Sequence, residues 1–254
     1  MRSLFRSRDR EPAVIVEPVP TVFPPIAGAD IAAVFAGKRV AGDFYDSVRV
    51  SPQRVLIGLL DVAGRRDDNR HLLTAAQEIF RTAGAELFSA ADVNESDAMT
   101  ELNHRLNRGL IDASSNVRSC PAFIACYHEV FGTLCYTNAG HLPGLLRDST
   151  SITELDSTGL PLGLFSHATA DARIVGLEKG AALLLVSRGL IACEGRINGS
   201  SEEFGLEGVK HFFQNVPVHS ARELCDSILN SVNDFSGNVP LCDDRTALSL
   251  IRLA

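Results

Sequence analysis

The sequence lacks two features that would place a chain in or across a membrane. No segment approaches the 18 or more consecutive apolar residues that a membrane helix requires, and no apolar stretch follows the basic start as it would in a signal peptide. We therefore expect a cytoplasmic protein with no membrane insertion.

Paired cysteines and an excess of basic residues are also missing. The six cysteines include no CxxC pair and show no zinc-ligand spacing, which is typical of reduced thiols in a cytosolic protein. The formal net charge is -7, so the chain has no basic stripe with which to neutralise nucleic-acid phosphates. Nucleic acid is not an expected partner, and the sequence gives no indication of the oligomeric state.

The first 25 residues differ in composition from the rest. MRSLFRSRDR is rich in arginine, and EPAVIVEPVPTVFPP after it is rich in proline. We expect residues 1–25 to be a mobile tail with a semi-rigid linker, and residues 26–254 to form the folded domain. An alternative is that the arginine-rich segment binds an acidic surface.

Strand-like and helix-like segments follow one another in an order typical of an α+β sandwich. Residues 31–36 and 55–62 are short apolar runs that predict strands, whereas 70–88 and 96–113 carry apolar residues at helical spacing. We expect Ser96 to cap the second of these helices. Further segments are expected as five strands between 122 and 187, helices over 200–216 and 220–235, the latter capped by Ser220, and a strand within 243–253. Helices covering a pair of packed sheets fit this order.

Aspartates stand at the ends of several of these predicted strands. Asp43 and Asp46 are expected to precede a strand, Asp61 ends an apolar run, and Asp243 and Asp244 open the last strand. Carboxylates that converge from separate strands form the oxygen-rich site that Mg²⁺ or Mn²⁺ prefers, and two such ions can activate a water against a phosphate ester. Alternatively, each aspartate simply ends a strand or caps a turn.

Six motifs in order give the chain a family resemblance. They are VAGDFYD, DVAG, TNAGHLPGLL, STGLPLGLF, LLLVSRGLIACEG and CDDRTALSLIRL, spread over about residues 22 to 254. This series resembles the SpoIIE-like branch of the metal-dependent protein phosphatases, the PPM family. The resemblance implies an α-β-β-α sandwich of two antiparallel sheets flanked by helices. It also implies a pair of Mn²⁺ or Mg²⁺ ions between the sheets.

The resemblance further implies hydrolysis of phosphoserine or phosphothreonine on a regulatory protein, in bacteria typically a STAS-type anti-sigma-factor antagonist. By motif position, the catalytic acids would be Asp43, Asp61 and Asp243. Asp61 would bridge the metals and Asp243 would be a late ligand, while Asp43 would hold a metal or its water. The carbonyl of Val62 would be a further metal ligand, and Asp46 and Asp244 would orient the ligands. His141 would either fix its loop through a hydrogen bond or act as a base.

Two arginines mark the first departure from the family pattern. After Asp61, where the family has a segment of the type DVSGHG, this chain reads DVAGRRDD, which introduces Arg65 and Arg66. Their guanidinium groups could clamp a substrate phosphate, or they could be solvated loop charges.

Arg188 is the second departure, because it replaces the aspartate of the family's SDG motif. An expected metal carboxylate thus becomes a cation that cannot deprotonate to act as a ligand. We expect Arg188 to point into the acidic cluster and pair with Asp61 or Asp243. Three alternatives follow: a phosphatase that keeps one metal through Asp43, Asp61 and Val62, a pseudophosphatase that binds a phosphoprotein without turnover, or an outward-facing Arg188 with Glu194 as a substitute ligand.

Overall fold

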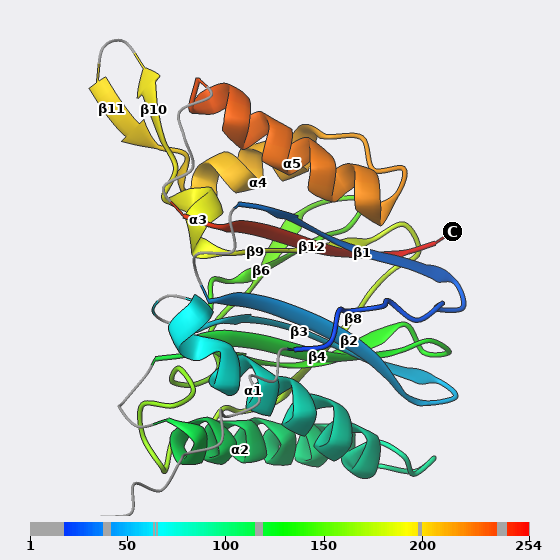
Figure 1. The fold of residues 1–254 in the computed structure, drawn as a ribbon. Coiled ribbons are helices and arrows are strands. Elements are labelled where there is room, and N and C mark those ends of the chain that lie inside the picture. Colours follow the sequence, from blue (N-terminus) through cyan, green and yellow to red (C-terminus); the bar gives the residue numbers. More distant parts are fainter. Residues whose placement is uncertain are drawn as a thin grey trace, which may run out of the picture.

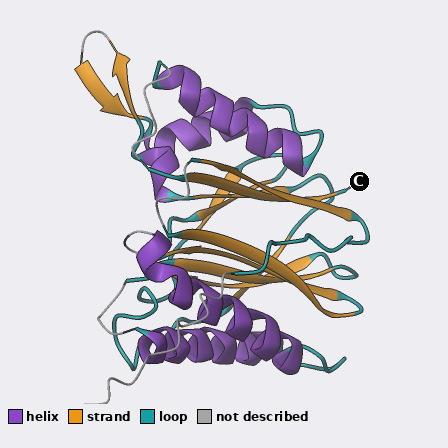
Figure 2. Ribbon diagram, in the orientation of Figure 1, coloured by secondary structure: helices purple, strands orange, loops and turns teal. Residues whose placement is uncertain are grey.

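The computed structural model describes residues 18–37, 42–62, 64, 66–114, 119–197, 200–237 and 243–253, with the side chains of 66–68 and 197 left out. Within these residues the chain forms four stacked layers, helices on the outside and two antiparallel sheets inside (Figures 1 and 2). The expected α-β-β-α sandwich is confirmed. The expected tail of residues 1–25 lies outside the described part as far as residue 17, and from residue 18 the chain is described.

The first sheet has the strand order β1-β12-β9-β6-β7. Its strands are β1 (Ala29–Ala36), β6 (Gly144–Arg147), β7 (Ile152–Leu155), β9 (Ala182–Val186) and β12 (Arg245–Arg252). The sheet is covered by α4 (Gly205–Asn215) and α5 (Ala221–Phe235), with the short helix α3 (Arg188–Ile191) at one end (Figure 1). The last described strand, β12, therefore lies inside the sheet, next to the first.

The second sheet has the order β2-β3-β4-β5-β8. It consists of β2 (Asp43–Ser51), β3 (Arg54–Asp61), β4 (Ala122–His128), β5 (Thr133–Ala139) and β8 (Arg173–Gly176), and its outer face is covered by α1 (Arg66–Leu87) and α2 (Glu95–Ala113). Strand alternation divides its side chains between two cores. For example, Leu56 and Leu60 pack toward the helices, whereas Ile57 and Leu59 face the first sheet.

Three local predictions were wrong. The strand expected after Asp43 and Asp46 already begins at Asp43, so both residues lie within β2. Residues 200–216 do not form one helix: β10 (Glu194–Ile197) and β11 (Ser200–Glu203) form a separate hairpin, and α4 starts only at Gly205. Gly205 has a φ of 68°, a left-handed conformation that favours glycine, and it makes the turn from strand to helix. The cap of α2 is Asn94 rather than Ser96, because the Asn94 side chain accepts hydrogen bonds from the backbone N–H groups of Ser96 and Asp97. The Ser220 cap of α5 is confirmed.

Cysteine pairing and helix hydrophobicity can be read over the described residues. Five cysteines that the structure describes are buried free thiols, and Cys242 lies outside the described residues. No helix in the described ranges combines the length and the apolar character needed to span a bilayer.

Candidate metal centre

The strand ends of the two sheets bring three of the expected acids to one end of the sandwich. Asp43 begins β2 and pairs in register with Asp61, the last residue of β3. Asp243 lies two residues before β12 of the facing sheet. The negative charges of Asp61 and Asp243 both help to raise the pKa of Asp43. We call these three residues, Asp43, Asp61 and Asp243, the acid cluster. Their carboxyl groups therefore interact electrostatically across the space between the sheets.

Asp43 is the most deeply buried member of the acid cluster, with 7% of its surface exposed. Its Oδ2 accepts a hydrogen bond of 2.8 Å from the hydroxyl of Thr246, and Ser187 also hydrogen-bonds to its side chain. Burial, opposed by these two bonds and reinforced by the neighbouring carboxylates, raises the pKa of Asp43 from 3.8 to about 7. At neutral pH this carboxyl group can therefore either hold or release a proton.

Ser187 and Thr246 were not anticipated as site residues. Ser187 follows β9 and Thr246 lies in β12, and both are fully buried. The backbone N–H of Ser187 donates to the carbonyl of Thr246 at 2.9 Å, and the N–H of Thr246 donates to Oγ of Ser187 at 3.0 Å. This reciprocal pair fixes the hydroxyl groups that hold Asp43.

Arg188 lies beside Asp61 but does not pair tightly with it. Burial and the charge of Asp243 raise the pKa of Asp61, and the positive charge of Arg188 opposes them. The Arg188 side chain is exposed, and no ion pair between described residues includes it. The expected direct pairing with Asp61 or Asp243 is therefore wrong within the described chain, although the electrostatic influence is present.

Glycines allow the backbone to approach closely around this centre. A Cβ added to Gly42 would lie 1.9 Å from the carbonyl oxygen of Val62, and one added to Gly189 would lie 2.0 Å from that of Asp244. Real Cβ atoms do not come so close to a carbonyl oxygen. The motifs AGD and SRG therefore require glycine because any side chain at these two positions would clash with the neighbouring backbone. The contact at Gly189 packs the start of α3 directly against the segment that carries Asp243.

Asp244 and Asp46, the two acids expected to orient ligands, are both buried but lie in different places. Asp244 is next to the acid cluster, where its N–H donates to Oδ1 of Asp243 at 2.8 Å. Asp46 lies three residues beyond Asp43 on β2, so its side chain points to the opposite face. There it accepts hydrogen bonds from Arg81 at 2.6 and 2.9 Å, and from Gln77 and Thr21. The structure does not bring Asp46 to the acid cluster; it links β2 to α1.

The remaining sequence candidates are placed as follows. His141 is buried, its Nδ1 lies 3.1 Å from the carbonyl oxygen of Leu142, and burial lowers its pKa to about 4, so it fixes its loop as a neutral imidazole. Glu194 lies on β10, outside the acid cluster, where its carboxylate accepts a hydrogen bond from Ser201. Arg65 is outside the described residues, and Arg66 is the first residue of α1 with an undescribed side chain.

The residues at this end of the sandwich offer oxygen donors for a hard cation. Carboxylates of Asp61 and Asp243 and the carbonyl of Val62 are oxygen donors of the kind that Mg²⁺ and Mn²⁺ accept. Among described residues, however, no three Asp, Glu, His or Cys side chains are grouped closely enough to hold a metal together. Mg²⁺ is commonly bound through one or two carboxylates with waters completing its shell, which suits this sparse set. Arg188, at the start of α3, offers no oxygen donor to this set.

The model of the family described as "Stage II sporulation protein E (SpoIIE)" matches residues 51–252 of the chain. The chain belongs to the SpoIIE family. No curated protein matches it significantly. The match of the SpoIIE family model covers Asp61, Arg188 and Asp243.

Solved structures agree with the fold of the SpoIIE family. The RsbU and RsbW domains of Rv1364c from Mycobacterium tuberculosis share 22% identity with a TM-score of 0.74, covering 91% of this chain and 62% of that one. The SiaA-PP2C domain of Pseudomonas aeruginosa shares 17% identity with a TM-score of 0.72, covering 87% and 84%. RsbX in complex with magnesium shares 14% identity with a TM-score of 0.56, covering 87% and 94%. The SpoIIE-family chain thus spans under two thirds of the first of these proteins.

Proposed function

We propose that the protein is a metal-dependent phosphatase that acts on phosphoserine or phosphothreonine of a regulatory protein in bacterial signalling. The observation that carries this proposal is the convergence of Asp43, Asp61 and Asp243 from both sheets at one end of the sandwich. Bringing like charges together is costly unless a cation or a proton compensates, so the acid cluster is suited to a cation. The crystal structure of RsbX with magnesium supports the choice of cation.

In this proposal Asp61, Asp243 and the carbonyl of Val62 would hold a single Mg²⁺ or Mn²⁺. Such a cation, when bound, lowers the pKa of a coordinated water and attracts the phosphate oxygens. Asp43, held by Thr246 and Ser187, can accept a proton at its carboxylate near neutral pH because its pKa lies at about 7. Asp244 fixes the segment that carries Asp243 through its N–H.

The substrate we propose is a phosphorylated STAS-type anti-sigma-factor antagonist. Support comes from the SpoIIE family match and from Rv1364c, in which an RsbU domain and an RsbW domain occur in one protein. A phosphoprotein substrate also suits a centre at the end of the sandwich, where Asp243 and Arg188 are both exposed.

A second candidate function is favoured by Arg188. Its positive charge beside Asp61 opposes the cation that the reaction requires, which would suit a pseudophosphatase that binds a phosphoprotein without hydrolysing it. The two functions differ in turnover and not in fold.

Hydrolysis of a phosphoserine peptide with and without Mn²⁺ separates the two candidates. Turnover that requires Mn²⁺ and falls at least 100-fold in Asp61→Asn supports the phosphatase. If the wild type shows no turnover but Arg188→Asp gains it, the pseudophosphatase is supported instead. Glu178→Lys, an exposed charge change outside the acid cluster, is the matched control.

A further inference from the structure

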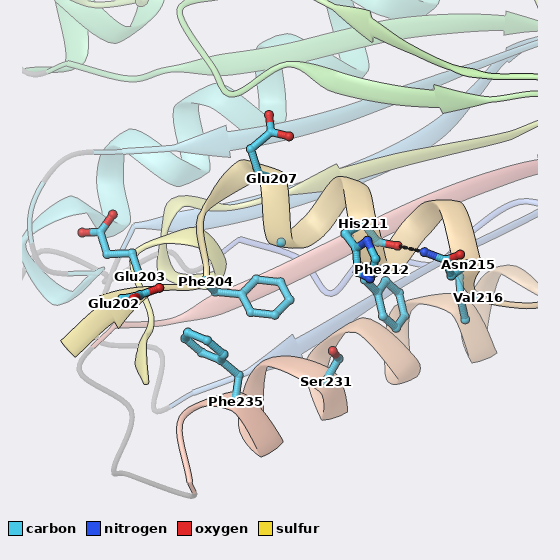
Figure 3. A pocket seen from close by; sticks show the side chains of 11 residues that line it. Glu202, Glu203, Phe204, Glu207, His211, Phe212, Asn215, Val216, Ser231 and Phe235 are labelled. Atoms are coloured by element: carbon cyan, nitrogen blue, oxygen red, sulfur yellow. Dashed lines mark hydrogen bonds between the residues drawn. The ribbon is translucent and has the colours of Figure 1, made fainter. Parts of the chain in front are cut away.

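A groove of about 650 Å³ lies between α4 and α5 at the foot of the β10–β11 hairpin (Figure 3). Its apolar lining is aromatic: the rings of Phe204 and Phe235 meet edge to face with centroids 5.3 Å apart, and Phe212 lies further along the same groove. All three phenylalanines are only partly buried. The groove can therefore receive apolar side chains from outside.

The groove has an acidic rim. Glu202 and Glu203 on β11 and Glu207 on α4 line it, and none of its lining residues is lysine or arginine. The nearby Lys210 is bound to Glu154 at 2.6 Å and to Glu207 at 2.7 Å. Glu202 and Glu203 are exposed, so they present negative charge beside an aromatic floor.

The groove is separate from the acid cluster. It belongs to the helical layer outside the first sheet, whereas Asp43 and Asp61 lie at the end of the second sheet (Figure 1). The hairpin above it pairs only β10 with β11, and every residue of β11 is exposed. β10 packs against α5, with Gly195 close to Phe235, so the exposed strand β11 is the part of the hairpin that a bound segment would cover.

One segment of this chain has the complementary chemistry. Residues 1–10, MRSLFRSRDR, contain the apolar pair Leu4 and Phe5 among four arginines. We propose that the groove between α4 and α5 binds this segment of the same molecule, with Leu4 and Phe5 against the phenylalanines and the arginines against Glu202 and Glu203. This inference does not depend on the proposed phosphatase activity.

The chain is long enough for this contact. Close to where the described chain begins, the N–H of Val19 donates to the Gln77 side chain on α1, which in turn donates to the Val19 carbonyl. Thr21 then binds Asp46 on β2. Val19 lies at the level of α1, three layers from α4 and α5, which is about 30 Å given layers about 10 Å apart. The twelve residues between Phe5 and Pro18, if extended, span about 40 Å.

Binding of a labelled peptide tests the proposal. A fluorescein-labelled peptide of residues 1–10 is titrated into the full chain, followed by fluorescence anisotropy. One variant carries Phe5→Ser, Arg6→Ser and Arg8→Ser, which removes the proposed internal competitor. We expect this variant to bind the peptide at least tenfold more tightly than the wild type, because a tethered segment competes at high effective concentration. Equal affinity for the two proteins would overturn the proposal.

Charge reversal in the groove tests the site itself. In the same tail variant, Glu202→Lys with Glu203→Lys should weaken peptide binding at least tenfold, whereas Glu178→Lys should change it less than twofold. These glutamates are exposed, so the substitutions leave the core intact. Binding that is insensitive to the glutamate pair would refute the site. Self-association of the wild type that is lost in the tail variant would show docking on a second copy and would likewise overturn the proposal.

Discussion

The hydroxyl of Thr246 donates a 2.8 Å hydrogen bond to Oδ2 of Asp43, joining β12 of the first sheet to β2 of the second across 203 positions of sequence. Both residues are buried, and the bond lies at the end of the sandwich where the acid cluster forms. A contact between the two sheets therefore also sets the position of the most buried carboxylate.

Thr246→Val should destabilise the protein. The substitution keeps the shape but removes the donor, leaving a buried carboxyl group one hydrogen bond short, which costs about 1–3 kcal/mol. Urea unfolding at pH 8 measures the change in the free energy of unfolding. Thr246→Ser retains the hydroxyl and should lose no more than about 1 kcal/mol, from one buried methyl group. Equal losses in the two variants would show that the hydrogen bond contributes nothing.

Metal-free protein should lose stability as the pH rises. The pKa of Asp43 is raised from 3.8 to about 7, so between these values the folded state holds a proton that the unfolded chain has released. The stabilisation is complete below about pH 4 and is lost as the pH rises through about 7. In EDTA, the Tm should fall between pH 5 and pH 8, and the fall should be smaller in Asp43→Asn. An identical pH profile for both proteins would contradict this assignment.

Arg188→Asp should bind Mn²⁺ at least tenfold more tightly than the wild type. The substitution removes a positive charge beside Asp61 and adds a possible oxygen ligand. Isothermal titration calorimetry measures the affinity. Arg188→Ala, which removes only the repulsion, should fall between the two proteins. Unchanged affinity in both variants would place Arg188 too far from the cation to matter.

Asp46→Asn should reduce stability without affecting cation binding. Asp46 is 1% exposed and holds Arg81, so its neutralisation leaves a partly buried guanidinium without its counter-charge, at a cost of about 1–3 kcal/mol. Urea unfolding gives the stability, and calorimetry should show Mn²⁺ affinity within twofold of the wild type. A large loss of Mn²⁺ affinity would instead show that Asp46 contributes to the cation site.

The sequence was sufficient to predict the layers and most of the acid cluster. Asp61 and Asp243 border strongly apolar strands, and such strands are recognisable because their side chains are buried on both faces. Asp46 could also have been placed correctly. It is three positions from Asp43, and in an extended strand an odd spacing sends two side chains to opposite faces. The sequence analysis placed the start of the strand after both residues, so the alternation of side chains between Asp43 and Asp46 was not used.

Other features depend on contacts that no local pattern encodes. Ser187 and Thr246 hold Asp43 only because β9 and β12 are neighbours, a pairing between distant segments. Glu202 and Glu203 precede a genuine helix and are good helix formers, so tertiary context, through the pairing with β10, decided in favour of a strand. The exposure of Arg188 likewise depends on a distant contact, because Gly189 at the start of α3 packs against the backbone of Asp244.

The interior place of β12 has a consequence for biosynthesis. On the ribosome, β1 and β9 emerge long before the strand that joins them, and Asp243 emerges with that strand. The first sheet thus remains divided until β12 emerges, with one edge of β1 and one edge of β9 unpaired and exposed to chaperones. A nascent chain cannot assemble the acid cluster, so the proposed cation site forms only once β12 has been inserted.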